Sequence, residues 1–212
     1  MTALTGTVAE GAQPSRRRLL DRGAIFAGWV GIGMAIVIAI AFELIVAVQP
    51  IVFLAAPIAG ILIGGYANQR SERWRPRWRL FANSLYAALV TGISLAVMYA
   101  VLRLVFIYGD TGYPDFNQVD SNGAPTGVQC ANGPDCTYQR YLEAGRGDEL
   151  TAAGVTDGAS FGSFVLREQA QGALILVVLT TAGAILPAAW RSITAPRPNR
   201  AAGQAAIGSS AP

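Results

Sequence analysis

The sequence contains no histidine and no lysine, and it has only two cysteines, Cys130 and Cys136. Histidine is the usual axial ligand of haem, the commonest metal ligand and the side chain whose ordinary pKa lies nearest neutrality. Its absence excludes a histidine-ligated haem, a histidine-based zinc site and a Ser-His-Asp triad. A metal site made of cysteines alone would need ligands from a second chain. We therefore expect no cofactor, no metal and no catalytic residues.

Charged residues are also scarce, at 14% of the 212 residues, whereas hydrophobic residues make up 52%. Such a chain is too apolar for one soluble core. A helix that crosses a bilayer needs about 20 mostly apolar residues. Stretches of this kind occupy approximately residues 23–48, 51–67, 80–108 and 169–190. The sequence predicts an all-α integral membrane protein whose residues 23–190 form a bundle of four transmembrane helices.

The charges outside these stretches are separated by sign. Twelve of the sixteen arginines lie before the first stretch, between the second and third, or after the fourth. The segment 109–166 instead carries eight acidic residues against Arg140 and Arg146. By the positive-inside rule both termini are cytoplasmic, and 109–168 is one long extracytoplasmic loop between helices 3 and 4. We read the exclusive use of arginine as genome composition, which favours the cytoplasmic (inner) membrane of a bacterium.

Residues 1–22 and 191–212 are rich in Ala, Gly, Ser, Pro and Arg and show no periodicity. We expect both to be disordered cytoplasmic tails. A cleaved signal peptide is the alternative for the first apolar stretch. That stretch is longer than the apolar region of a typical signal peptide, which has 7–15 residues, so we favour a helix that stays in the membrane.

The basic loop SERWRPRWR between the second and third stretches interleaves tryptophan with arginine. Its place beside the membrane favours anionic lipid headgroups over nucleic acid as the partner. Tryptophan is also enriched at the membrane interface. The residues predicted to contact headgroups are Arg70, Arg73, Arg75, Arg77, Arg79, Trp74 and Trp78.

Cys130 and Cys136 bracket the turn-prone sequence ANGPD in the predicted outer loop. We predict a disulfide, because this side of the membrane is oxidising; two free thiols are the alternative. Nearby Asp and Asn residues superficially suggest calcium, but the pattern has Val119 and Thr126 where an EF-hand needs a ligand and a glutamate. The following sequence TYQRYLEA predicts a short helix that places Tyr138 and Tyr141 on the membrane surface or on a partner.

Small residues recur at every fourth position in three of the apolar stretches, which gives each helix a ridge that allows close packing. The first ridge is Ala27, Gly31, Ala35 and Ala39; the second is Ala56, Gly60 and Gly64; the third is Ser84, Ala88, Gly92, Ala96 and Ala100. Whether each ridge packs within the chain or against a second protein is open at this point.

Glu43 and Arg103 are the two charges within the apolar stretches. Glu43 continues the first ridge by one turn, and Arg103 lies three residues beyond the third. Each lies five residues before the predicted outer end of its helix, about 7–8 Å below the boundary. We expect an intramembrane ion pair if the two ridges pack together. A functional polar site and independent snorkelling of Arg103 are the alternatives.

These features favour a non-catalytic membrane protein, an accessory, assembly or scaffold subunit of a larger membrane complex with other membrane protein subunits as partners. The alternative is a small transporter or channel with an outward-facing polar site at Glu43 and Arg103. Its path to the inside would rely on few polar residues, namely Asn83, Ser84, Thr180 and Thr181. An enzyme that uses the acidic outer loop is the least favoured class, because any loop with eight acids contains carboxylate pairs.

Overall fold

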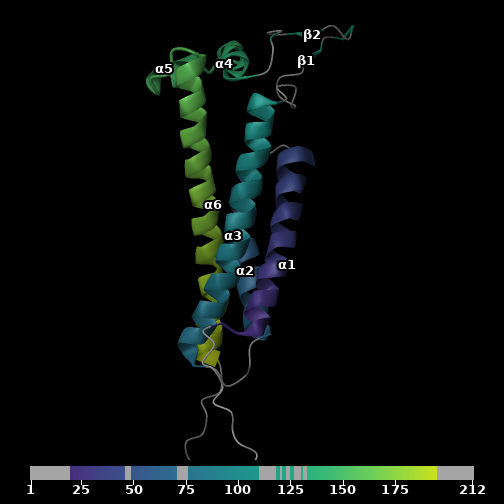
Figure 1. The fold of residues 1–212 in the computed structure, drawn as a ribbon, viewed down its shortest axis with the longest axis vertical. Coiled ribbons are helices and arrows are strands. Elements are labelled where there is room, and N and C mark those ends of the chain that lie inside the picture. Colours follow the sequence, from purple (N-terminus) through teal and green to yellow (C-terminus); the bar gives the residue numbers. More distant parts are fainter. Residues whose placement is uncertain are drawn as a thin grey trace, which may run out of the picture.

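The computed structural model describes residues 20–45, 49–70, 76–109, 118–119, 121–122, 125–126, 130 and 133–194. Four long helices run side by side (Figure 1), and all four are long and apolar enough to cross a membrane. They are α1 (Arg22–Ala39), continued by a π-helix η1 (Ile40–Ile45), then α2 (Gln49–Gln69), α3 (Arg77–Tyr108) and α6 (Gly158–Thr194). The prediction of four membrane-spanning helices is therefore confirmed at the level of length and composition. The tails 1–19 and 195–212 lie outside the described residues.

The helix α6 starts about three turns earlier than the predicted fourth span, at Gly158 instead of Gln169. Its first residue follows Asp157, whose Oδ1 accepts a hydrogen bond of 2.7 Å from the backbone N–H of Ser160. This is the geometry of a helix N-cap. Part of the predicted outer loop is thus an extension of the bundle helix.

Two short helices, α4 (Pro134–Glu143) and α5 (Gly147–Ala152), pack beside the start of α6. The two-residue strands β1 (Gln118–Val119) and β2 (Pro125–Thr126) pair antiparallel nearby. We call residues 133–157 together with the first two turns of α6 the cap, and Figure 1 shows the cap at one end of the bundle.

The cap has its own apolar core, built around Phe161, which is fully buried with Leu150, Val155 and Val165. Tyr138 and Tyr141 of α4 pack on the Phe161 ring at centroid distances of 5.9 and 5.1 Å. The predicted helix is present, but its tyrosines face this core instead of a membrane surface. The reason is that α6 extends far enough to present Phe161 to them.

The closest helix contact joins α2 and α6. A Cβ atom at Gly60 would overlap the carbonyl oxygen of Thr180, and a Cβ at Gly183 would overlap the carbonyl oxygen of Pro57. Farther along, a Cβ at Gly64 would lie 2.9 Å from the Cβ of Ala184. The second ridge therefore packs within the chain, where the missing side chains let the two backbones touch.

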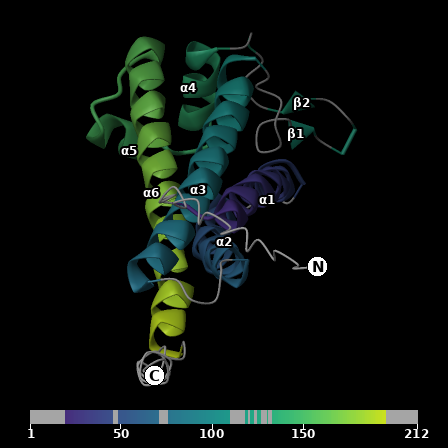
Figure 2. The same cartoon turned by 60° about the horizontal axis from the view of Figure 1, so that its bottom comes forward.

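The first ridge is buried, as is the third except for the half-buried Ala100, and at Gly31 and Gly92 the two ridges meet different neighbours. Gly31 of α1 packs against Thr91 of α3, whereas Gly92 packs against Val177 and Thr180 of α6. Figure 2 shows the resulting order, with α1 and α6 on different sides of α3. The sequence left open what each ridge packs against, and at Gly92 the neighbour of the third ridge is α6.

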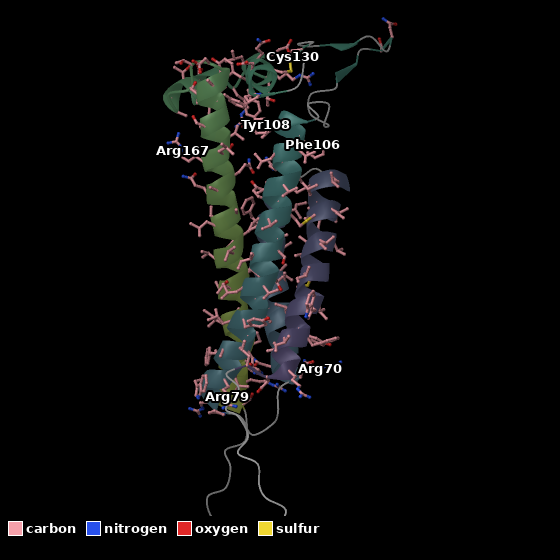
Figure 3. All side chains as sticks on the ribbon, viewed as in Figure 1. Arg70, Arg79, Phe106, Tyr108, Cys130 and Arg167 are labelled. Atoms are coloured by element: carbon pink, nitrogen blue, oxygen red, sulfur yellow. A yellow bond between two sulfur atoms is a disulfide. The ribbon has the colours of Figure 1, made fainter. Side chains whose placement is uncertain are left out.

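A disulfide joins Cys130 to Cys136, whose Cα atoms are 5.5 Å apart. It closes a small ring at the start of α4, and Figure 3 shows Cys130 at the cap end of the molecule. By loop-closure entropy such a ring contributes about 2 kcal/mol.

Removing this disulfide is expected to loosen the cap and leave the bundle intact. In the variant Cys130→Ser with Cys136→Ser, amide exchange in α4 should accelerate by roughly tenfold or more, which is what a loss of about 2 kcal/mol implies. Hydrogen exchange with mass spectrometry measures this segment by segment. An equal acceleration in the middle of α3 and α6 would contradict the expectation, since the ring meets α6 near its start, where Gly158 and Gly162 lie beside Asp135 and Pro134.

Candidate functional site

The two ends of the bundle differ in charge. Arg70, Arg77, Arg79 and Arg191 lie at the end where α2 and α6 finish and α3 begins, which we call the arginine end. Figure 3 shows Arg70 and Arg79 there, opposite Tyr108 and Cys130 at the cap end. Each end has a layer of buried polar side chains just inside it.

The layer nearer the cap contains the one predicted pair of intramembrane charges. Arg103 Nε on α3 donates to Glu43 Oε2 in η1 over 3.2 Å. The Glu43 side chain is 6% exposed and that of Arg103 is 16% exposed. The guanidinium also lies 5.2 Å from the centre of the Tyr99 ring, and Tyr99 makes an edge-on contact with Phe53 of α2. The structure therefore brings the two charges together. Tyr99 of α3 packs on Arg103, and Phe53 of α2 packs on Tyr99.

Gln169 of α6 belongs to the same layer. It is 5% exposed, and its Oε1 atom has no hydrogen-bond donor among the described residues. It lies one turn on the cap side of Gly172, which packs against the Tyr99 hydroxyl. Because α3 and α6 are antiparallel, Gln169 and Arg103 lie at similar heights. We define Glu43, Tyr99, Arg103 and Gln169 as the cap-side polar layer.

The sequence did not single out Tyr99 and Gln169, although one signal was available. Gln169 shares a buried stripe with Gly172, Leu176, Thr180 and Gly183, at spacings of three and four residues. Phe161 and Val165 continue this stripe before the predicted span, but their apolar segment alone is too short to read as part of a span. Tyr99 carried no comparable signal, because aromatic residues are common in apolar helices.

The depth of the pair in the membrane stays a prediction, and the helix lengths give its distance from the arginine end. Arg103 lies about 36 Å along α3 from Arg79, and Glu43 about 32 Å along the first helix from Arg22. The hydrocarbon core of a bilayer is about 30 Å thick. The distance from the arginine end to the pair is therefore comparable with this thickness. Beyond the pair, α3 continues to the cap, where Ile107 packs against the apolar core.

The layer nearer the arginine end consists of two hydrogen-bonded groups. Asn83 Nδ2 donates to Asp21 Oδ2 over 3.0 Å, and its Oδ1 accepts from the Asp21 backbone N–H. Asn68 Nδ2 donates to Ser84 Oγ over 2.8 Å, and that hydroxyl donates to the carbonyl oxygen of Gly64. These bonds tie α3 to the start of α1 and to the end of α2.

An apolar layer separates the two polar layers. Val52, Leu95 and Leu176 from α2, α3 and α6 are completely buried there, together with Ala35, Ala39 and Ala56. The hydroxyls of Thr91 and Thr180 lie close by, but each donates to the carbonyl four residues earlier in its own helix. Among the described residues, the interior therefore offers no row of available polar groups through this layer.

The residues predicted to contact lipid lie partly at the arginine end. Arg70 stacks between two rings, with its guanidinium carbon 5.7 Å from the centre of Phe26 and 5.5 Å from that of Tyr66. Arg79 stacks on Trp78. Arg77 and Trp78 are exposed. Arg73, Trp74 and Arg75 lie outside the described residues.

In the cap, hydrogen bonds from the Ser160 backbone and hydroxyl hold the pKa of Asp157 below its usual range. Burial raises the pKa of the Tyr141 hydroxyl, which lies beside Arg146. The guanidinium of Arg146 stacks 4.4 Å from the Tyr141 ring centre and pairs with Glu149, whose pKa it lowers.

The Asp157 cap is expected to weaken in acid. Because the folded pKa lies below the unfolded one, its contribution is complete above the unfolded value, near pH 4, and is lost as the pH falls through the folded pKa. Near-ultraviolet circular dichroism of the cap tyrosines should therefore change below about pH 4. Asp157→Asn keeps a good N-cap without the titrating group. An unchanged acid transition in that variant would mean that another carboxylate controls it.

Within the described residues no group of three or more His, Cys, Asp or Glu side chains is arranged to hold a metal ion. The cap-side polar layer can hold one ion pair and accept one further hydrogen bond at Gln169. No family model, no curated protein and no solved structure matches this chain.

Proposed function

We propose that this chain is a non-catalytic accessory, assembly or scaffold subunit of a larger membrane complex. In this proposal it lies in the bacterial inner membrane, with both termini and the arginine end in the cytoplasm. The disulfide supports an extracytoplasmic cap, because structural disulfides persist in oxidising compartments. The segregation of the arginines supports the same orientation.

The observation that supports the proposal is the apolar layer between the two polar layers of the interior. The polar groups of the arginine-end layer bond one another except for Asn68 Oδ1, and the apolar layer of Val52, Leu95 and Leu176 separates them from Glu43 and Arg103. A transporter needs polar groups that a substrate can reach in turn. The interior contacts instead hold the four helices together. The outer faces of the helices and the cap are then left for contacts with other subunits.

The test is purification of the tagged full chain from its native membrane in a mild detergent. We expect a larger membrane protein to elute with it at a fixed stoichiometry, and the reciprocal purification through that protein to recover this chain. We also expect this chain to be degraded when the partner is deleted. Recovery of the chain alone or as a homo-oligomer, at normal abundance, would overturn the proposal.

A small transporter or channel is the second candidate, and Gln169 is the observation that favours it. Its buried acceptor Oε1 lies level with the Glu43–Arg103 pair and could receive a hydrogen bond from a ligand. Flux into proteoliposomes that stops in Glu43→Gln while the protein keeps its fold would support this function. Absence of flux across wild-type vesicles would exclude it for the solutes tested.

A further inference from the structure

A groove runs between α3 and α6 near the arginine end. It has a volume of about 160 Å³ and is lined mainly by Phe81 and Leu85 of α3 and by Thr181, Ile185 and Ala188 of α6. The Ser84 hydroxyl at its floor is already bonded to Gly64 and Asn68. The groove therefore presents an almost wholly apolar surface, at a depth where the surrounding solvent is hydrocarbon.

Two arginines stand at the mouth of this groove. Arg77 lies four residues before Phe81, and Arg191 lies three residues after Ala188, so each is one helical turn outside the groove on its own helix. Within the described part of the chain, no carboxylate forms a salt bridge with either of them. Trp78 and Trp190 beside them are 52% and 71% exposed, as tryptophans at a membrane interface are.

We propose that this place binds one anionic phospholipid, with the phosphate held between Arg77 and Arg191 and one acyl chain lying in the groove. Arginine is suited to a phosphodiester because its planar fork donates two parallel hydrogen bonds. The apolar groove directly beneath the charges selects a lipid over a free phosphate ion, which would leave the groove unfilled. The proposal rests on the membrane location of the helices and does not depend on the accessory role.

A second groove on the same pair of helices provides a matched control. It lies nearer the cap and is lined by Ile93, Val97, Ala173 and Leu174 among others. The arginine nearest to it on α3 is Arg103, which is already paired with Glu43. On α6 the exposed Arg167 lies six residues before Ala173, more than one helical turn from the groove. The two grooves therefore share an apolar lining and differ, among the described residues, in the unpaired arginines within one turn of it.

The test is native mass spectrometry of the purified full chain with phosphatidylglycerol and phosphatidylcholine added at equal concentrations. We expect wild-type protein to retain one phosphatidylglycerol in preference to phosphatidylcholine. Arg77→Gln with Arg191→Gln should weaken that retention by roughly tenfold or more, given the attraction of each arginine for an anionic lipid surface. Arg22→Gln, an exposed arginine at the same end on α1, should leave it unchanged.

Substitutions that fill each groove test the acyl-chain contact separately from the headgroup contact. Thr181→Phe should reduce phosphatidylglycerol retention, whereas Ala173→Phe in the second groove should not, and added inorganic phosphate should not compete. Equal retention of both lipids by the wild type, no effect of the double arginine variant, or an equal effect of Arg22→Gln would each overturn the proposal. Only variants that elute as the wild type does are compared; if Thr181→Phe fails to fold, the arginine variants decide alone.

Discussion

Replacing Gly60 with alanine is expected to lower the free energy of unfolding by about 3 kcal/mol. The added Cβ would overlap the carbonyl oxygen of Thr180, which is backbone and cannot rotate away, so α2 and α6 must separate along their whole contact. Gly183→Ala should have a similar effect, because its Cβ would overlap the carbonyl oxygen of Pro57. Equilibrium unfolding in mixed detergent micelles, followed by far-ultraviolet circular dichroism, measures the change.

Two glycines of the same bundle serve as controls. A Cβ at Gly65 would meet its nearest neighbour, Pro187, at an ordinary 3.7 Å, and a Cβ at Gly33 would meet nothing within 4 Å. Alanine at either position should be neutral or slightly stabilising, since alanine is the better helix former. If Gly60→Ala were as stable as Gly65→Ala, the close approach of α2 and α6 would be wrong.

Breaking the Glu43–Arg103 pair from one side is expected to cost about 3 kcal/mol, the lower end of the range for buried pairs. The two single variants should differ. Arg103 can extend toward water when Glu43→Leu removes its partner, because its side chain is long enough to snorkel toward the nearer end of the bundle. Glu43 cannot, so Arg103→Leu should be the more damaging change.

The double variant Glu43→Leu with Arg103→Leu should recover most of the lost stability, since it leaves no buried charge uncompensated. The exchange Glu43→Arg with Arg103→Glu should also recover part of it. A double-mutant cycle on unfolding free energies measures this coupling. Additive effects of the two single changes would mean that the charges act independently. Glu149→Gln, in the exposed pair with Arg146, should have no detectable effect.

The helices were predictable because the bilayer requires long apolar runs, and the runs near α1, α2 and α3 end within a few residues of the observed helices. The start of α6 was missed because Gly158–Leu166 is too short an apolar segment to read as part of a span. Only the cap explains it, since Phe161 and Val165 are buried by α4 and α5. The η1 segment has no signal in the sequence at all.

The site was partly predictable for a similar reason. Equal spacing from the helix ends placed Glu43 and Arg103 at one height, and the structure brings them together. Their contact was predicted only if the first and third ridges pack together, whereas Gly92 packs on α6. A ridge of small residues indicates which face of a helix packs but not which helix packs against that face, because small side chains allow any helix to approach closely. Partner choice depends on all four helices at once.

The continuity of α6 has a mechanical consequence. This helix runs without interruption of its secondary structure from Gly158 in the cap to Thr194 at the arginine end, a length of about 55 Å. Phe161, which anchors the cap, and Thr180, which touches Gly60, therefore belong to one rod, and both lie on the same side of Pro187. A torque applied to the cap must be transmitted to the α2–α6 contact or absorbed by bending the rod between them.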